Sequence, residues 1–312
     1  MSYSFSEIKF QSADGKNTVN AEIYTPRGKN IRGVVQLSHG MLDYVGRYRN
    51  LAEYLTERGY VFAGNDHLGH GKTAASDEDF GYFAERDGVL SVLRDIHTMN
   101  KYLRGEFVGV PVILLGHSMG SFLSRLYVER HPHSIAGHII HGTGGPNPLL
   151  PFGKALVRWK KIFHGERYRS KTLADLAFMG YNSHFDKSEG KNAWLTRDGA
   201  TVSGRDADSM SNFTFTASAF GDLFKMVGDS NSKAWFASYP KTLPTFIMSG
   251  GDDPVGDFGR GPHHVYKQLM VSGVSNVRLK IYDGARHELF NEINREEVFA
   301  DIVAFCEGVA VK

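Results

Sequence analysis

Short apolar runs and amphipathic stretches alternate along most of the 312-residue chain. Short runs of apolar and β-branched residues indicate buried strands, whereas apolar residues three or four positions apart indicate helices. Residues 18–25 alternate apolar with polar side chains, which predicts a half-exposed edge strand. Further, mostly apolar strands are predicted at 33–38, 60–65, 110–115, 134–140, 245–249 and 277–282.

Helical patterns separate these strands. They cover residues 48–58, 89–104, 118–130, 263–271 and 295–306. Strands that alternate with helices favour right-handed crossovers and a mostly parallel sheet. The alternation stops between residues 146 and 240, where the helical patches 152–163, 172–179 and 215–227 occur without a convincing strand. We therefore expect an α/β core domain formed by residues 1–145 and 241–312, with residues 146–240 inserted as a helical cap.

Composition and charge narrow the class of protein. The chain is 41% hydrophobic, which is enough for a full globular core. Its 36 basic and 34 acidic residues nearly cancel, so a nucleic-acid partner is not expected. No apolar run reaches the roughly 20 residues of a membrane span, and the first residues lack a secretory signal pattern. The single cysteine, Cys306, lies in an apolar stretch, which is typical of inert packing in a reducing compartment. These features predict a soluble, cytoplasmic protein of the size of an enzyme.

Residues 116–120 (Gly-His-Ser-Met-Gly) match the pattern G-x-S-x-G. The pattern alone is weak in a glycine-rich chain, but here it follows the predicted strand 110–115 and precedes a helical run. A nucleophilic serine on a strained strand-to-helix turn requires this context, and flanking glycines avoid collisions there. Ser118 is therefore the candidate nucleophile. An ordinary turn between a strand and a helix is the alternative.

A serine nucleophile needs a base and a carboxylate, which in this kind of fold follow it in the order Ser, Asp or Glu, His. Asp252 and Asp253 come just after the predicted strand 245–249, and His287 follows the strand 277–282. Because catalytic groups of open α/β sheets gather at the carboxyl ends of the strands, these side chains are expected to meet Ser118.

A tetrahedral oxyanion also needs two preorganised N–H donors. One is expected from Met119, directly after the nucleophile, and the other from Met41, in the loop after the strand 33–38. His39 in the same loop is a potential second base, although a histidine that braces the loop is the simpler interpretation.

The chain resembles the α/β-hydrolase superfamily, and within it the monoacylglycerol lipase and lysophospholipase group (serine aminopeptidase S33-like hydrolases). The matching segments appear in family order at residues 37–41, 65–73, 116–120, 253–256 and 286–288. The resemblance implies a mostly parallel eight-stranded sheet flanked by helices, with a helical cap over the site. It also implies Ser118 as nucleophile, Asp253 rather than Asp252 as acid, His287 as base, and backbone N–H groups of Met41 and Met119 as the oxyanion hole.

The expected activity is hydrolysis of medium- or long-chain acyl esters of the monoacylglycerol or lysophospholipid type. Among the apolar side chains of the insertion, those expected to bind substrate are Trp159, Phe178, Phe213 and Phe220. A small-ester carboxylesterase, a non-catalytic ligand receptor and an aminopeptidase or amidase are the alternatives. Acidic groups in the insertion would favour the aminopeptidase, and the candidates are Glu166, Asp175, Asp186 and Glu189.

Three further patterns in the sequence suggest other kinds of site. Residues 66–73 come within one residue of a phosphate-binding loop, but Asp66 replaces the first glycine and would repel phosphate. His67 and His70 lack the partners typical of a metal site, and no metal or cofactor is expected. Residues 152–163 form a basic amphipathic helix, which can lie on an anionic lipid surface or pack its apolar stripe over the substrate tunnel.

Overall fold

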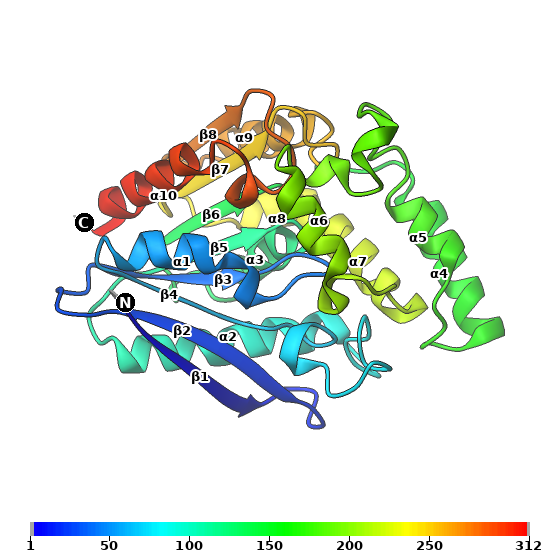
Figure 1. Cartoon of the computed structure of the whole chain (residues 1–312), viewed down its shortest axis with the longest axis horizontal. Helices are drawn as coiled ribbons and strands as arrows, with labels where there is room; N and C mark the ends of the chain where they lie inside the picture. The colour runs from blue at the N-terminus through cyan, green and yellow to red at the C-terminus, as the bar shows by residue number, and fades with distance from the viewer. Residues whose placement is uncertain (1–2, 311–312) are drawn as a thin grey trace.

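The computed structural model describes residues 3–310. Eight strands form one sheet in the order β1-β2-β4-β3-β5-β6-β7-β8 (Figure 1). The strands are β1 (Tyr3–Gln11), β2 (Thr18–Pro26), β3 (Gly33–Ser38), β4 (Tyr60–Asn65), β5 (Val112–His117), β6 (Gly137–His141), β7 (Thr245–Gly250) and β8 (Val277–Tyr282). β1–β2 and β2–β4 pair antiparallel, and the remaining pairs are parallel. The predicted α/β architecture with a mostly parallel sheet is confirmed.

The edge of the sheet differs from the prediction. Residues 18–25 were expected at the edge, but β2 lies between β1 and β4 and is almost entirely buried. β1 takes the edge instead, with Phe5 half exposed. In its second half, the partly buried Ile8 and Phe10 alternate with the polar residues Glu7, Lys9 and Gln11, which is the pattern that an edge strand requires. The prediction of an edge strand was therefore right in kind but assigned to the wrong segment.

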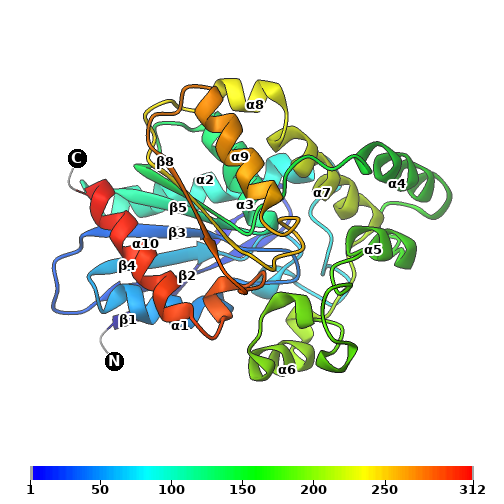
Figure 2. The same cartoon turned by 90° about the horizontal axis from the view of Figure 1, so that it is seen from above.

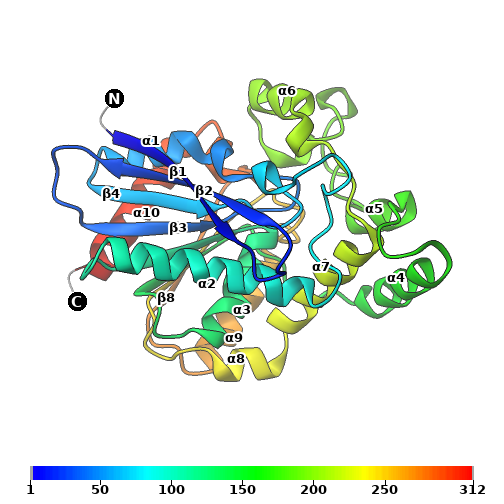
Figure 3. The same cartoon turned by 90° about the horizontal axis from the view of Figure 1, so that it is seen from below.

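Helices cover both faces of the sheet (Figures 2 and 3). α1 (Arg49–Thr56) and α10 (Arg295–Ala310) lie on one face, and α2 (Gly88–Glu106), α3 (Met119–Arg130) and α9 (Arg260–Val271) lie on the other. Two apolar clusters result, one under each helical layer. Because neighbouring side chains of a strand point to opposite faces, Val34 enters one cluster and Val35 the other. Cys306 is fully buried in the second cluster, and burial raises its pKa to about 12.

The chain between β6 and β7 forms helices joined by loops, with one isolated β-bridge between Arg169 and Thr216. The helices are α4 (Leu150–His164), α5 (Lys171–Ala177), α6 (Gly199–Ala207), α7 (Ala217–Ser230) and α8 (Lys233–Ser238). α4 to α7 extend beyond one end of the sheet (Figure 1), whereas α8 packs on α3. Short 3-10 helices are η1 (Val45–Tyr48), η2 (Gly71–Thr73), η3 (Lys187–Glu189), η4 (Ala193–Leu195), η5 (Ser209–Ser211) and η6 (Leu289–Asn291). Within residues 3–310, no helix combines the length and the apolar character that crossing a bilayer requires.

α4 packs on α7 through small residues. A Cβ at Gly153 would approach the Phe224 ring to 2.8 Å, and a Cβ at Gly221 would approach Val157 to 3.1 Å, so the two helices lie close together. Leu150 and Leu156 are partly buried beside this contact. The exposed apolar side chains of α4 are Phe152, Trp159, Ile162 and Phe163. The packed face of α4 is therefore the one that carries Gly153 and Val157, and not the stripe that includes Trp159.

Candidate active site

Ser118 lies at the turn from β5 into α3 in a strained backbone conformation, with φ of +53° and ψ of −119°. Side chains other than glycine rarely adopt this region, and they persist there where the surroundings enforce it. The flanking glycines make the turn possible: a Cβ at Gly116 would overlap the Ser124 hydroxyl, and one at Gly120 would overlap the Ser38 carbonyl. The turn therefore has the geometry of a nucleophile elbow.

The fold brings Ser118, His287 and Asp253 together from three different loops. Ser118 Oγ lies 2.8 Å from His287 Nε2. His287 Nδ1 lies 2.9 and 3.0 Å from the two carboxylate oxygens of Asp253. The Val255 N–H donates to Asp253 Oδ1 at 2.9 Å, and the Ser249 hydroxyl donates to Oδ2 at 3.3 Å. These distances suit the tautomer in which His287 Nδ1–H donates to Asp253 while Nε2 faces the Ser118 hydroxyl.

The electrostatics of Asp253 suit an ionised carboxylate. Its side chain is fully buried, and burial acts to raise its pKa. His287 and the Val255 N–H outweigh this effect, so that the pKa of Asp253 lies below its usual value. Asp253 therefore stays charged opposite His287.

Asp252 has a different environment from its neighbour. Its side chain is exposed and lines a separate polar cavity of about 330 Å³ together with Arg286. Of the two candidate carboxylates, Asp253 is the one that meets His287.

Met41 and Met119 line the same cavity as Ser118. The two segments approach closely, since a Cβ at Gly40 would lie 3.2 Å from Ser118 Cβ. His39 braces this loop: its Nδ1 donates to the Gly40 carbonyl, and its Nε2 accepts from the His67 N–H, each at 2.8 Å. Burial lowers the pKa of His39, consistent with a neutral ring that holds the loop.

A cavity of about 1040 Å³ opens above Ser118. Its apolar wall comes from α4, α7 and the loop before α4, and includes Leu149, Leu150, Leu223, Phe224 and Val227. Its polar wall, near α6, includes Asn182, Asn192, Arg205, Asp206 and Asn212.

Two of the four aromatic residues expected to bind substrate line this cavity, namely Phe178 and Phe213. Trp159 does not, because it lies on the outer face of α4, where it is 48% exposed. Phe220 does not either, because it faces inward on α7 and is fully buried against Phe215 and Phe224.

Trp194 and Glu288 contribute to the site although the sequence pattern does not single them out. The Trp194 ring lies 5.1 Å from the His287 ring, and the Trp194 carbonyl accepts from the His287 N–H at 3.3 Å. Glu288 directly follows His287 and forms buried ion pairs with Arg47 and Arg205. The adjacency of Glu288 to His287 is a local signal, whereas the positions of Trp194 and Arg205 follow only from the tertiary structure.

Other histidines near the site are not suited to act as bases. His117 and His141 lie with their Nδ1 atoms 2.8 Å apart, and burial lowers the pKa of His141 to about 3 and that of His117 well below its usual value. Burial likewise lowers the pKa of His70 to about 3. Within residues 3–310, no group of three or more histidine, cysteine or acidic side chains is arranged to hold a metal ion.

The family model described as "Serine aminopeptidase, S33" matches residues 29–294. Human monoglyceride lipase is 32% identical over 266 residues, which is 84% of this chain and 77% of that protein. A monoacylglycerol lipase of Mycolicibacterium smegmatis is 25% identical over 310 residues, or 96% of each chain. Among solved structures, a thermostable carboxyl esterase from Bacillus coagulans aligns with a TM-score of 0.91 at 30% identity, covering 98% of this chain and 99% of the esterase. The chain therefore belongs to the serine aminopeptidase S33 family, as a monoacylglycerol lipase-like carboxylic ester hydrolase with the α/β-hydrolase fold.

Proposed function

We propose that this protein cleaves carboxylic esters through a triad of Ser118, His287 and Asp253. The observation that carries the proposal is the continuous hydrogen-bonded chain from Ser118 Oγ to His287 (2.8 Å) and on to Asp253 (2.9 Å). A neutral imidazole held in this orientation can take the serine proton, which makes the hydroxyl a nucleophile.

The reaction then proceeds in two halves. His287 Nε2 accepts the Ser118 proton while Oγ attacks the ester carbonyl, and the oxyanion accepts hydrogen bonds from the Met41 and Met119 N–H groups. The intermediate collapses as His287 returns the proton to the departing alcohol, which leaves an acyl-Ser118. Water then attacks the acyl group, its proton passes to His287, and the fatty acid departs as Ser118 regains its proton.

The size and the apolar lining of the cavity favour an ester with a medium or long acyl chain as the substrate. We propose that residues 146–240 act as a cap whose helices α4 and α7 enclose the acyl chain, since Leu150, Phe224 and Val227 form the apolar wall. Each methylene that leaves water for such a wall gains about 0.8 kcal/mol. The polar wall near Asn192 and Asn212 suits the hydrophilic head of a monoacylglycerol or lysophospholipid. The names of the relatives favour the monoacylglycerol.

The aminopeptidase alternative finds little support in the acidic residues of the cap. Glu166, Asp175 and Glu189 are already paired, with Lys161, Lys171 and Arg286 respectively. Of the acidic residues proposed for that role, only Asp175 lines the cavity. Faster turnover of an aminoacyl amide than of any ester would nevertheless reverse our assignment.

We further propose that the outer face of α4 contacts micelles or membranes. Its exposed apolar side chains are Phe152, Trp159, Ile162 and Phe163, and Arg158 and Lys160 add positive charge beside them. Of the other basic residues of α4, Lys154 lies against Gly228 of α7 and Lys161 pairs with Glu166. Apolar and cationic side chains on one surface helix are the combination that binds anionic lipid. A cytoplasmic location, expected from the lone cysteine, stays a prediction.

The decisive test pairs Ser118→Ala with a series of p-nitrophenyl esters from acetate to octanoate, each kept below its critical micelle concentration. For the wild type, kcat/KM should rise by roughly fourfold per methylene until the cavity is full. Ser118→Ala should lose several orders of magnitude in turnover and should no longer react with a fluorophosphonate probe.

The same experiment decides between the alternatives. Retention of more than a few per cent of wild-type turnover by Ser118→Ala would refute the triad. A steady fall in kcat/KM from acetate upward would point to a small-ester carboxylesterase. A wild-type protein that the fluorophosphonate does not label would point to a ligand receptor.

A further inference from the structure

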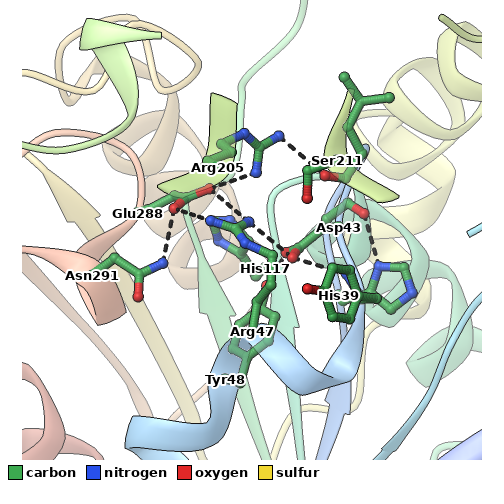
Figure 4. Close-up of polar contacts among 12 residues, drawn as sticks. His39, Asp43, Arg47, Tyr48, His117, Arg205, Ser211, Glu288 and Asn291 are labelled. Carbon is green, nitrogen blue, oxygen red and sulfur yellow. Dashed lines mark hydrogen bonds and ion pairs between the residues drawn. The ribbon is translucent and has the colours of Figure 1, made fainter. Parts of the chain in front are cut away.

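A buried ion-pair network surrounds Glu288, the residue that follows His287 in the chain (Figure 4). The Glu288 carboxylate accepts two hydrogen bonds from Arg47, at 2.9 and 3.1 Å, and one from Arg205 at 3.1 Å. Asn291 Nδ2 donates to Glu288 Oε2 at 2.8 Å. The side chains of Arg205 and Glu288 are only 7% and 5% exposed, so that these charges interact largely shielded from water.

The two arginines come from different parts of the molecule. Arg47 belongs to η1 in the core, where it also pairs with Asp43 at 3.0 Å. Arg205 belongs to α6 in the cap. Burial acts to raise the pKa of Glu288, but Arg47 and Arg205 outweigh this effect and lower it. Arg47 and Asn291 both belong to the core, so among the side chains that contact the Glu288 carboxylate Arg205 is the one whose position depends on where the cap sits.

Arg205 also reaches the oxyanion loop. Its Nη2 donates to the Leu42 carbonyl at 3.1 Å. Leu42 directly follows Met41 and has a φ of +55°, a conformation that leucine rarely adopts. A hydrogen bond to the carbonyl of such a residue helps to hold the strained turn, and thereby the preceding N–H group, in place.

We propose that Arg205 is a positioning residue that transmits the docking of the cap to both halves of the catalytic site. One end of its guanidinium holds Glu288, next to the base His287, and the other end holds Leu42, next to the oxyanion donor Met41. The inference rests on the proposed triad and oxyanion hole. The cap also contacts the loop that carries His287 through the backbone, since the Leu195 carbonyl accepts from the Glu288 N–H at 2.6 Å.

The role requires the shape of arginine. A guanidinium presents several N–H donors in a fixed planar fork, so it can hold a carboxylate and a carbonyl at the same time. A lysine at this position keeps the charge but concentrates its donors at one atom. Loss of the bridge leaves the triad residues in place but less accurately aligned, and misplacement of reacting groups by about 1 Å can cost on the order of a hundredfold in rate.

The test compares Arg205→Met and Arg205→Lys with wild type on p-nitrophenyl acetate. Acetate has no chain to fill the apolar wall, so kcat on this ester reports the catalytic loops and not the acyl pocket. We expect Arg205→Met to lower kcat at least tenfold with KM changed less than threefold, and to slow inactivation by a small fluorophosphonate by a similar factor. Arg205→Lys should restore part of the lost kcat.

Arg167→Gln is the matched control, because Arg167 also links the cap to the core, through an exposed pair with Asp79 at 3.2 Å. It should stay within twofold of wild type. Circular dichroism and thermal melting test whether each variant is folded. If Arg205→Met does not fold, Arg205→Lys serves in its place, and we expect its kcat to be at least threefold below that of wild type. An acetate kcat within twofold of wild type in the folded Arg205 variants would overturn the inference. Ser118→Ala in the same series separates the two proposals: activity in that variant refutes the triad, whereas an inactive Ser118→Ala beside a fully active Arg205→Met refutes only the role of Arg205.

Discussion

At the end of β7, one position along the chain separates a buried carboxylate from an exposed one. Asp253 accepts from His287 at 2.9 Å, whereas the exposed Asp252 lines a separate cavity. We expect Asp253→Asn to reduce kcat by on the order of 10⁴-fold, because the amide no longer favours the required tautomer of His287. Asp252→Asn, which removes the same charge one residue away, is the control and should change kcat less than threefold. Reversed losses would transfer the role to Asp252.

Between pH 5 and 8, the activity should depend on the ionisation of a single group. His287 must be neutral to accept the Ser118 proton, so kcat/KM should rise with pH as the imidazole loses its proton. Asp253 should not add a second step between pH 5 and 8, because the pKa of this carboxyl lies below its usual value and the group is already ionised there. The measurement is kcat/KM for a short soluble ester between pH 5 and 8. A flat profile would contradict a histidine base.

The sequence predicts the position of a catalytic residue best where that residue directly follows a strand. Ser118 and His287 follow predicted strands, and parallel strands bring their carboxyl ends together. Arg205 lies 83 residues from Glu288, and only the folding of the cap brings them into contact. The local sequence around Arg205 carries no sign of that contact.

At the scale of elements, periodicity locates helices better than it identifies their buried faces. The patches 152–163 and 215–227 correspond to α4 and α7. α4 nevertheless packs through Gly153 and Val157, because small residues let α7 approach closely, and Trp159 stays outside. Hydrophobicity alone cannot distinguish an apolar stripe that packs from one that is left exposed.

The contact between α7 and the start of α2 should make stability depend on pH. The carboxylate of Asp222 on α7 lies against the first residue of α2, since a Cβ at Gly88 would overlap it. Burial raises the pKa of Asp222 to about 7, although Lys161 and the Val89 N–H act in the opposite direction. Between pH 4 and 7 the folded protein thus holds a proton that the unfolded chain has lost, so this group destabilises the fold as pH rises.

Asp222→Asn keeps the size and shape of the side chain and removes the titration. The measurement is the free energy of unfolding in urea at pH 5 and at pH 8. The difference between Asp222→Asn and wild type should shift in favour of the variant by on the order of 2 kcal/mol from pH 5 to pH 8. This is less than the whole pKa change would give, because the side chain is partly exposed. Asp66 and Asp95, whose pKa values burial raises to about 6, are present in both proteins and cancel in the comparison. An equal pH dependence in the two proteins would contradict the assignment.

At the scale of the whole molecule, α4 has two different surroundings. Leu150 and Gly153 line the cavity above Ser118. Ile162 and Phe163 are 67% and 66% exposed. α4 lies at the end of the molecule opposite the two termini (Figures 1 and 3). A lipid surface that touched this helix would therefore lie beside the cavity, and an acyl ester could pass from one to the other with little exposure to water.

Membrane contact through α4 predicts that Ile162→Glu weakens binding to anionic vesicles. An apolar side chain of this size gains about 2 kcal/mol when it is fully buried, so its replacement by a carboxylate should reduce the partition coefficient at least tenfold. Co-sedimentation with phosphatidylglycerol vesicles measures this change, and added salt should weaken wild-type binding because the basic residues of α4 attract the lipid charge.

Val271→Glu is the matched control, since Val271 is 75% exposed on α9, away from α4. Because Ile162 does not line the cavity, kcat/KM of Ile162→Glu on a soluble short-chain ester should equal that of wild type. Equal sedimentation of both variants with wild type would show that α4 is not the lipid-binding surface.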